Sequence, residues 1–173
     1  PKSINKECTT NIINRLLKHS DGNVYAFCNR SVFKCSMNQT VETVFPDIAI
    51  PSPTYSVAQA PDKDIYIGTE SNGLYIYSEN WKLKKHVPID GIIATILPDN
   101  NGDIWLGLDE TGICLFNKNK QTFTWLHKDN TNLNNNSIRT FVSYGDSSIL
   151  VGTFRGLNIL NKKELTITPA NIN

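Results

Sequence analysis

The sequence lacks an excess of charge of either sign and any long hydrophobic run. Seventeen Lys and Arg residues stand against 16 Asp and Glu in 173 residues, a formal net charge of +1. Such a balance disfavours nucleic acid as a partner. No segment approaches the roughly 18 apolar residues of a membrane-spanning helix, and residues 1–10 lack the apolar centre of a signal peptide. We therefore expect no direct membrane insertion of this segment, and the missing initiator Met predicts that it was processed or excised from a longer parent.

Cysteine is also scarce. Four are present, at Cys8, Cys28, Cys35 and Cys114, which is too few for a disulfide scaffold, and none forms a close CxxC pair. Cys28 and Cys35 are candidates for neighbours in one hairpin. The prediction for all four is a role as small apolar packing residues.

Alanine is rare as well, with six in the chain, whereas Ile, Thr and Val are abundant. No long apolar stripe of helical period is present, so we expect almost no helix. The apolar fraction of 39% and aromatic fraction of 9% are nevertheless those of a folded domain rather than a disordered chain.

A repeat organises the chain. Each copy has a turn, an apolar triplet, a glycine, a polar loop, a second glycine and an alternating apolar segment. The first glycine recurs at Gly68, Gly107 and Gly152, with Phe27 in the first copy, so the copies are 41, 39 and 45 residues apart. The four hairpins defined in this way are 21–35, 62–77, 101–116 and 146–160.

Short apolar segments flank every hairpin. They are too short for typical helices and rich in β-branched residues, which predicts four short strands in each repeat. The upstream segments are 12–17, 55–58, 92–97 and 138–142, and the downstream segments are 41–45, 83–87, 122–126 and 165–167.

A tandem four-stranded antiparallel unit of about 40 residues is typical of a β-propeller blade. We therefore predict an all-β fold in which residues 1–173 form one propeller segment. A blade buries its two apolar faces by stacking on neighbours. The expected blades are 11–46, 54–88, 92–127 and 137–169.

The motif resembles the two-component regulator propeller repeat. The residues that carry the resemblance are Ile104-Trp105-Leu106-Gly107, Ile65-Tyr66-Ile67-Gly68-Thr69 with Gly73-Leu74-Tyr75-Ile76-Tyr77, and the lead-in Leu133 to Ile138. The resemblance covers residues 11 to 168 and implies a sensory role in the periplasmic part of a hybrid two-component sensor kinase anchored in the inner membrane. It further implies a response to carbohydrate fragments. No kinase motif is present, so any kinase activity belongs to other regions of the parent.

Four blades are fewer than the seven usual in that family. The chain is therefore expected to be a fragment of a larger seven-bladed propeller, with a four-bladed ring or two copies completing one another as alternatives. Exposed blade faces predict association with a second copy or with the remaining blades of the parent chain.

The polar hairpin tips are the candidate ligand site, because in propellers they gather on one face with the starts of the innermost strands. Arginine at a tip suits a carboxylate or sulfate, while carboxylates and amides suit sugar hydroxyls. The alternative is that these are ordinary solvated turns. The candidates are Arg30, Glu70, Asn72, Asp109, Glu110 and Arg155 at the tips, with Arg139 and Tyr55 on the innermost strands.

The tryptophans and histidines give weaker signals. Trp105 occupies the position of Tyr25, Tyr66 and Leu150 in the other copies and is expected to pack between blades, while edge packing is the main expectation for Trp81 and Trp125.

His19 is expected in a turn, and His86 and His127 show no spacing typical of a metal site or a triad. We therefore predict neither a cofactor nor catalysis. A protein-interaction scaffold and, further off, a propeller hydrolase or lyase are the alternatives.

Overall fold

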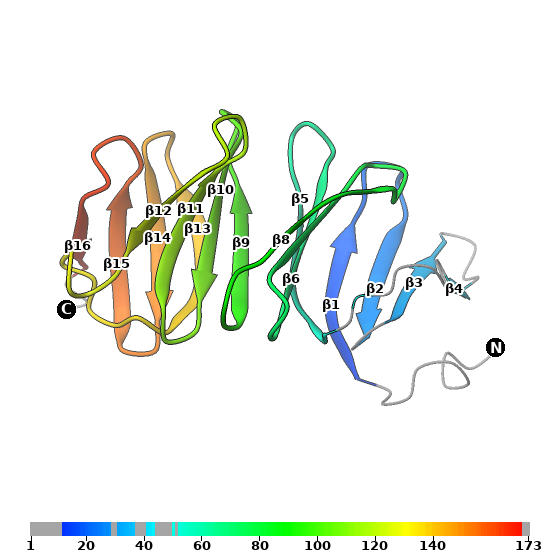
Figure 1. The fold of residues 1–173 in the computed structure, drawn as a ribbon, viewed down its shortest axis with the longest axis horizontal. Helices are drawn as coiled ribbons and strands as arrows, with labels where there is room; N and C mark the ends of the chain where they lie inside the picture. Colours follow the sequence, from blue (N-terminus) through cyan, green and yellow to red (C-terminus); the bar gives the residue numbers. More distant parts are fainter. Residues whose placement is uncertain (1–11, 29–30, 37–40, 44–49, 51, 171–173) are drawn as a thin grey trace. The chain divides into compact units, whose positions relative to one another are not determined.

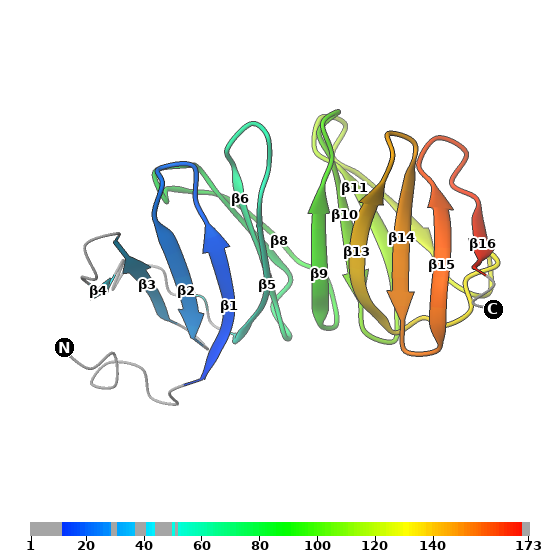
Figure 2. The ribbon, with the colours of Figure 1, turned by 180° about the vertical axis from the view of Figure 1, so that it is seen from behind.

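The computed structural model describes residues 12–28, 31–36, 41–43, 50 and 52–170, and in this part of the chain all regular structure is β-strand. The strands form four antiparallel sheets of four, and each sheet is made of consecutive strands (Figures 1 and 2). The prediction of four-stranded antiparallel blades in an all-β fold is therefore confirmed. These residues include no helix long and apolar enough to cross a bilayer.

The chain divides into two compact units, residues 1–90 and 91–173, and each unit is described by itself. Unit 1 contains blades 1 and 2. Blade 1 consists of β1 Ile13–Lys18, β2 Val24–Cys28, β3 Ser31–Cys35 and β4 Val41–Thr43, and blade 2 of β5 Thr54–Gln59, β6 Ile65–Thr69, β7 Leu74–Tyr77 and β8 Leu83–Val87.

Unit 2 contains blades 3 and 4. Blade 3 consists of β9 Ile93–Pro98, β10 Asp103–Leu108, β11 Gly112–Asn117 and β12 Thr122–Leu126, and blade 4 of β13 Ile138–Tyr144, β14 Ser148–Thr153, β15 Gly156–Asn161 and β16 Ile167–Pro169.

The two central strands of a blade are covered on both faces, and this explains their nearly continuous apolar sequences. All residues of β6 and β7 are buried, whereas four of the five residues of β8 are exposed. The lysines on β8 keep this edge strand polar, which protects it against pairing with another chain. Lys84 also forms an ion pair of 2.7 Å with the carboxylate of Asp64.

A hydrophobic core lies between the paired blades of each unit. We call the face of a blade that contacts the next blade its leading face, and the face that contacts the preceding blade its trailing face. In unit 2 the leading face of blade 3 packs against the trailing face of blade 4. The leading residues are Leu97, Trp105, Ile113 and Leu115, and the trailing residues are Ile138, Phe141, Ile149, Val151, Leu160 and Ile167.

The first repeated glycine permits close approach of two blades. A Cβ built on Gly107 would lie 2.5 Å from Cγ2 of Ile138 on blade 4 and 2.6 Å from Cγ2 of Thr95 in its own blade. Any side chain at this position would overlap them. Gly107 is therefore a notch into which Ile138 inserts.

The second repeated glycine begins the return strand of the hairpin. Gly112 has a φ of +98°, and a Cβ there would lie 2.5 Å from the carbonyl oxygen of Leu126. Both its conformation and its surroundings thus require glycine. The hairpin bend expected at this position is confirmed.

The outermost strand of blade 4 starts later than the sequence predicts. β16 begins at Ile167 rather than at Leu165, because Leu165 has a φ of 55° and the N–H of Asn161 donates to the carbonyl of Thr166. Leu165 and Thr166 therefore still belong to the turn before β16. In blade 1 the expected fourth strand continues to 45, but residues 44–45 lie outside the described residues.

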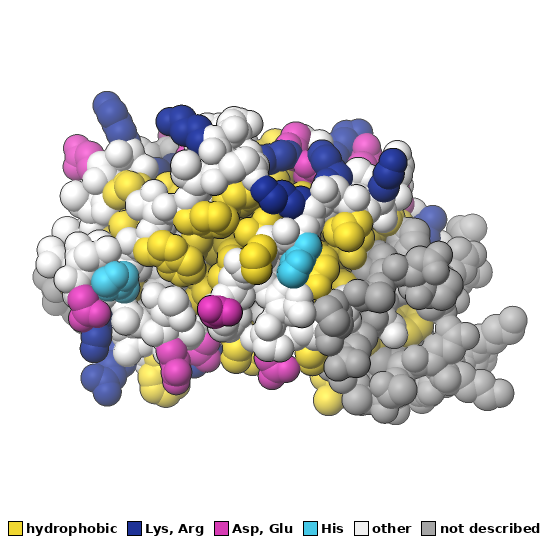
Figure 3. Space-filling view, viewed as in Figure 1, with side chains coloured by type: hydrophobic (Ala, Val, Ile, Leu, Met, Phe, Trp, Pro, Cys, Tyr) yellow, Lys and Arg dark blue, Asp and Glu magenta, His cyan; other side chains and the backbone are white. Residues whose placement is uncertain are grey.

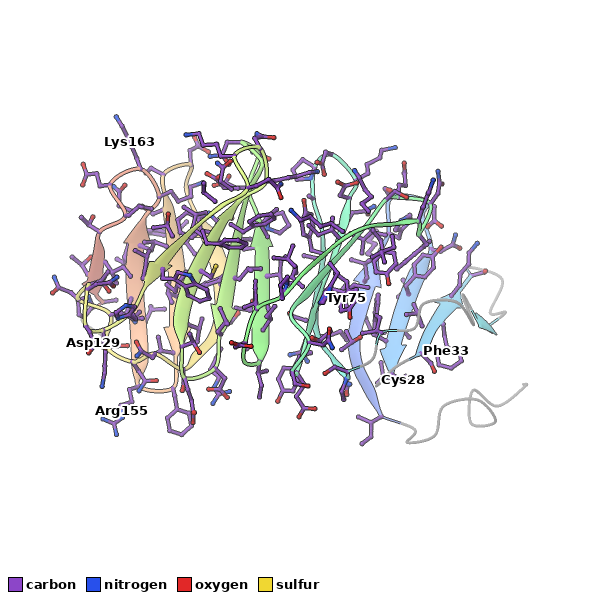
Figure 4. All side chains as sticks on the ribbon, viewed as in Figure 1. Cys28, Phe33, Tyr75, Asp129, Arg155 and Lys163 are labelled. Carbon is purple, nitrogen blue, oxygen red and sulfur yellow. The ribbon has the colours of Figure 1, made fainter. Side chains whose placement is uncertain are left out.

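The expectation for cysteine is wrong at Cys28. Cys28 is buried and disulfide-bonded, whereas Cys35 and Cys114 are free thiols. Cys28 and Cys35 are not neighbours either, because they pair with Ser31 and Val24 at opposite ends of one hairpin. Figure 4 shows Cys28 and Phe33 within blade 1. Cys114 is buried and free, as expected of a packing residue, and burial raises the pKa of its thiol to about 12.

Trp81 and His19 are more deeply buried than the sequence suggests. Trp81 is a core residue rather than an edge residue, and its ring lies 4.7 Å from that of Tyr25 and 5.7 Å from that of His19. His19 is in the β1–β2 turn, as predicted, but it is buried there. The ring of Trp81 thus covers the end of blade 1.

Asp21 completes this turn. Burial alone would raise the pKa of its carboxyl, but hydrogen bonds from the Asn23 backbone N–H, the Tyr25 hydroxyl and His19 outweigh it and hold the pKa well below its usual range. Burial, and secondly the hydrogen bond to Asp21, raises the pKa of the Tyr25 hydroxyl to about 12. The ionised form of Asp21 therefore stabilises the folded state.

Candidate functional site

The first strand of every blade contains a β-bulge at the same position. Pairing with the second strand skips one residue in each sheet. A bulge frees a residue from the ladder and redirects its side chain, and bulges are common beside binding sites. The four skipped residues are Asn14, Tyr55, Ala94 and Arg139.

The bulges lie at the same end of the blades as the β2–β3-type hairpin tips. In blade 4, Ile138 at the start of β13 pairs with Thr153, the last residue before the β14–β15 tip. Figure 4 shows Arg155 at this end of blade 4 and Lys163 at the opposite end. We call the end that carries bulges and tips the tip end.

In unit 2 the tip end brings together three side chains from three segments. Nη1 of Arg139 lies 3.1 Å from Oδ2 of Asp109, which is in the β10–β11 tip of blade 3. The guanidinium carbon of Arg139 is 5.5 Å from the ring centroid of Phe154 in the β14–β15 tip. Phe154 is 71% exposed, the highest value among the large exposed hydrophobic residues described. We call this group the Asp109–Arg139–Phe154 cluster.

Backbone hydrogen bonds fix the segments that hold the cluster. The N–H of Asp109 donates to the carbonyl of Ile92 at 3.0 Å, and the N–H of Phe154 donates to the carbonyl of Ser137 at 2.9 Å. Ser137 Oγ also accepts from the N–H of Glu110 at 3.3 Å. The cluster therefore lies on tips that are attached to the starts of β9 and β13.

A second network supports the lead-in to β13. The side chain of Asn134 accepts at Oδ1 from Thr153 Oγ1 and from Asn158 Nδ2, both at 2.8 Å. Asn158 is fully buried, so its amide depends on these partners. The Asn134 amide also donates to the carbonyl of Arg155 at 3.3 Å.

In unit 1 the tip end is arranged differently. The guanidinium carbon of Arg15 lies 5.9 Å from the ring centroid of Tyr55, the bulge residue of blade 2. The amide of Asn14, the bulge residue of blade 1, donates to the carbonyl of Thr54 at 3.1 Å. Glu70 is exposed at the β6–β7 tip.

Asn72 has a role within its own blade. Its Oδ1 accepts from the hydroxyl of Tyr75 at 2.8 Å, and its carbonyl lies 2.7 Å from Nε2 of His86. The rings of Tyr75 and His86 stack at 4.4 Å. The side chain of Asn72 therefore holds the tip in place.

The structure joins some of the predicted residues and leaves others apart. Asp109 and Arg139 are in contact, and Glu110 adjoins them through Ser137. Tyr55 and Glu70 are at the tip end of unit 1, and Arg155 is exposed on the tip that carries Phe154. Arg30 lies outside the described residues.

Arg15 was not among the residues expected at the site, and Phe154 was expected only as a residue of the candidate tip that carries Arg155. The available signal for Phe154 was a large aromatic residue in a polar tip beside glycine. For Arg15 the sequence offered none, because Arg15 is paired in the ladder and its interest comes from the contact with Tyr55 of blade 2.

Two other sets of surface groups lie outside the cluster. Trp125 and Phe123 on β12 are 37% and 42% exposed, and Figure 3 shows hydrophobic side chains at the surface in the region of this strand. His127 lies 3.5 Å from Asp129 in the following loop. The described residues contain no group of three or more His, Cys, Asp or Glu side chains placed to hold a metal ion.

Comparison with known proteins supports the fold. No family model and no curated protein matches the sequence. Among solved structures, the extracellular domain of the hybrid two-component system BT4673 from B. thetaiotaomicron has a TM-score of 0.79 at 17% identity, over 94% of this chain and 22% of that one. The corresponding domain of BT3049 from the same organism has a TM-score of 0.72 at 17% identity, over 93% and 25%.

A third similar structure is that of a variant of an enzyme. It is a catalytically inactive virginiamycin B lyase from Staphylococcus aureus with quinupristin, with a TM-score of 0.72 at 16% identity, over 98% of this chain and 58% of that one. The chain thus spans about a quarter or less of the sensor domains and just over half of the lyase. At these identities the likeness concerns the fold, which is that of β-propeller blades.

Proposed function

We propose that this chain is a ligand-sensing, extracytoplasmic segment of a two-component sensor, that it is not catalytic itself, and that it contributes to a site for carbohydrate fragments. The observation that carries the proposal is the Asp109–Arg139–Phe154 cluster at the tip end of unit 2. The similar extracellular domains of B. thetaiotaomicron two-component systems support the sensory part and an extracytoplasmic location.

The chemistry of the cluster suits a sugar. An exposed aromatic ring offers an apolar surface for the C–H face of a pyranose, and a guanidinium and a carboxylate offer donors and acceptors to adjacent hydroxyls. Arg139 retains further N–H donors beyond the one directed to Asp109, because a guanidinium has five. The ion pair also fixes the orientation of the guanidinium before a ligand arrives, which lowers the entropic cost of binding.

The lyase relationship is the basis for a catalytic alternative, and the described residues give it less support. The three histidines of the chain lie in different environments: His19 is buried under Trp81, His86 stacks on Tyr75, and His127 adjoins Asp129. None of them is part of the Asp109–Arg139–Phe154 cluster. The cluster therefore has the composition of a binding site.

The test is binding of defined oligosaccharides to the full chain. Calorimetric titration and thermal unfolding would be measured with a panel of purified neutral and uronate-containing oligosaccharides, since a ligand of the native state raises the unfolding temperature. We expect at least one class to bind, with affinity reduced about tenfold or more in Phe154→Ala and Arg139→Ala, as expected for hot-spot residues.

Lys163→Ala, at the opposite end of blade 4, is the matched control and should bind as the wild type does. Absence of binding by every oligosaccharide would overturn the carbohydrate proposal. Equal binding by Phe154→Ala, Arg139→Ala and Lys163→Ala would remove the cluster from it.

A further inference from the structure

The outermost strand of blade 3 lacks the features that usually protect an edge strand against pairing. β12 has the sequence Thr-Phe-Thr-Trp-Leu, and among the described residues it pairs with β11 alone. The strand contains no charged residue and no proline, and four of its five residues are exposed. Threonine and aromatic residues favour the β conformation. An uncharged edge strand of this composition is a template for pairing with another chain.

The outermost strands of the other blades differ from β12 in this respect. β4 is three residues long and includes Glu42. The residues at the positions of Thr124 and Trp125 are Lys85 and His86 in β8, and Thr168 and Pro169 in β16. Two β8 strands paired about Lys85 would bring like charges together, and Pro169 has no N–H to donate. Blade 3 is therefore the blade whose outer edge is suited to accept a strand.

The free edge of β12 is formed by the backbone of Phe123 and Trp125. The carbonyl of Trp125 accepts a hydrogen bond from Nδ2 of Asn130 at 2.8 Å, so it points away from β11. Backbone groups alternate in direction along a strand, so Phe123 also directs its N–H and carbonyl outward, whereas Thr124 directs its own toward β11. A carbonyl has two lone pairs, so that of Trp125 can accept a second hydrogen bond.

The sequence of β12 is complementary to itself about Thr124. In an antiparallel pair of two such strands with Thr124 opposite Thr124, Phe123 of each copy lies opposite Trp125 of the other. Thr122 lies opposite Leu126. The rings of Phe123 and Trp125 are on one face of the strand and are 42% and 37% exposed, so both are available for contact. Aromatic pairs and threonine pairs across strands are stabilising.

We propose that two copies of this chain associate through β12, which pairs antiparallel with β12 of the second copy about a two-fold axis at Thr124. Phe123 and the opposite Trp125 exchange both of their outward backbone hydrogen bonds. The occupant is a second copy because the strand is complementary to its own sequence. The contact is isologous, so it closes at two copies. It involves one strand of each copy, so we expect a weak dimer, in the micromolar to millimolar range.

This contact is separate from the stacking of blades. Blades 3 and 4 pack through their faces, whereas β12 offers the outer edge of its sheet. Further blades of a longer chain would therefore leave this edge free. The proposal also does not depend on the ligand proposed above.

The test is a reversal of charge at Thr124. Thr124→Lys and Thr124→Glu each place like charges opposite one another at the axis, and the exposed side chain makes a loss of fold unexpected. Sedimentation velocity over a concentration series should show a dimer of the wild type and a dissociation constant raised about fivefold or more in either variant. An equimolar mixture of the two variants should regain association, because opposite charges then meet.

The matched controls are on the outermost strand of blade 4. Thr168 is exposed on β16 at the position of Thr124, so Thr168→Lys and Thr168→Glu should associate as the wild type does. Phe123→Pro tests the backbone, since it removes an outward N–H that the β11 ladder does not use, and it should abolish the dimer. Far-UV circular dichroism and the thermal midpoint would establish that each variant is folded.

Four outcomes would overturn the proposal. One is a single-chain mass for the wild type at all concentrations. The second is a dissociation constant of Thr124→Lys and Thr124→Glu equal to that of the wild type. The third is a mixture of these two variants that associates no more than either alone. The fourth is weakening by the Thr168 substitutions as large as that by the Thr124 substitutions, because the contact would then not be specific to β12.

Discussion

The notch at Gly107 allows the packing between blades to be tested at one atom. In Gly107→Ala the new methyl group would lie 2.5 Å from Cγ2 of Ile138 and 2.6 Å from Cγ2 of Thr95. Both distances are far below van der Waals contact, so blade 4 must shift or side chains must leave their rotamers. Overpacking of this kind costs about 1–3 kcal/mol in the free energy of unfolding.

Gly152→Ala provides the comparison at the same position of the repeat. Its methyl group would meet Thr140 Cγ2 at 2.8 Å but no residue of another blade. The difference between the two variants therefore reports the contact across blades. We expect Gly107→Ala to lower the free energy of unfolding by at least about 1 kcal/mol more than Gly152→Ala does.

A double-mutant cycle with Ile138→Ala completes the test. That substitution alone removes a fully buried side chain and should cost about 2–5 kcal/mol. It also removes the Cγ2 atom that the new methyl group meets. The double variant should therefore be destabilised by about 1 kcal/mol less than the sum of the two single variants. Urea unfolding at one low chain concentration gives the free energy of unfolding of the wild type, both single variants and the double variant, from the midpoints and slopes.

Equal destabilisation by Gly107→Ala and Gly152→Ala would refute the reasoning, as would simple additivity in the cycle. Either result would mean that the glycine is needed for its own strand and not for the neighbouring blade.

Three further predictions concern individual side chains. The pKa of Asp21 is lowered in the folded state, so its contribution to stability is present above its unfolded pKa of about 3.9 and is lost as the pH falls below it. The difference in free energy of unfolding between wild type and Asp21→Asn, measured by urea unfolding, should therefore shrink below about pH 4. A constant difference from pH 7 to 3 would contradict this. With its thiol pKa raised to about 12, Cys114 should resist iodoacetamide at pH 8 in the native chain while the half-buried Cys35 reacts first, as read by peptide mass spectrometry. Trp81→Ala should lower the free energy of unfolding by about 3–5 kcal/mol, and a wild-type urea midpoint would show that Trp81 is not a core residue.

The strands and their grouping into blades could be predicted from sequence because the same pattern of apolar segments and glycines occurs in four copies. The glycine at Gly68, Gly107 and Gly152 marks the same point of each second strand, and the alternation around it has the strand period. Trp105 was placed correctly between blades for the same reason, since its counterparts in the other copies are also large and apolar.

The features that were missed depend on contacts between distant residues. Trp81 lies in a polar segment, so its sequence environment suggests an edge, but its positive φ of 60° and the rings of blade 1 place it in the core. The disulfide at Cys28 was missed because scarcity of cysteine does not exclude a single bond. Spacing alone carries no information on either contact.

The candidate site was only partly predictable because its geometry comes from a bulge. Asp109 and Arg139 were selected as polar residues near one face, but their contact joins two neighbouring blades and two residues that are 30 apart in the sequence. Phe154 lies in a tip that was expected at the site, but its contact with the guanidinium of Arg139 is visible only in the structure. A register shift of one residue at Arg139 produces this arrangement, and no pattern within β13 announces it.

Packing and recognition are assigned to different positions of the same repeat. At the position after the apolar triplet, three of the four copies have glycine; a side chain at Gly107 or Gly152 would meet its own inner strand, and at Gly107 it would also meet blade 4. At the bulge the four copies differ completely, with Asn14, Tyr55, Ala94 and Arg139. A bulge residue is outside the ladder, so its side chain can change without altering how blades stack. The tip end can therefore acquire different binding chemistry in each blade on an unchanged core, and we expect exchanges of Tyr55 and Arg139 to change ligand affinity far more than the free energy of unfolding.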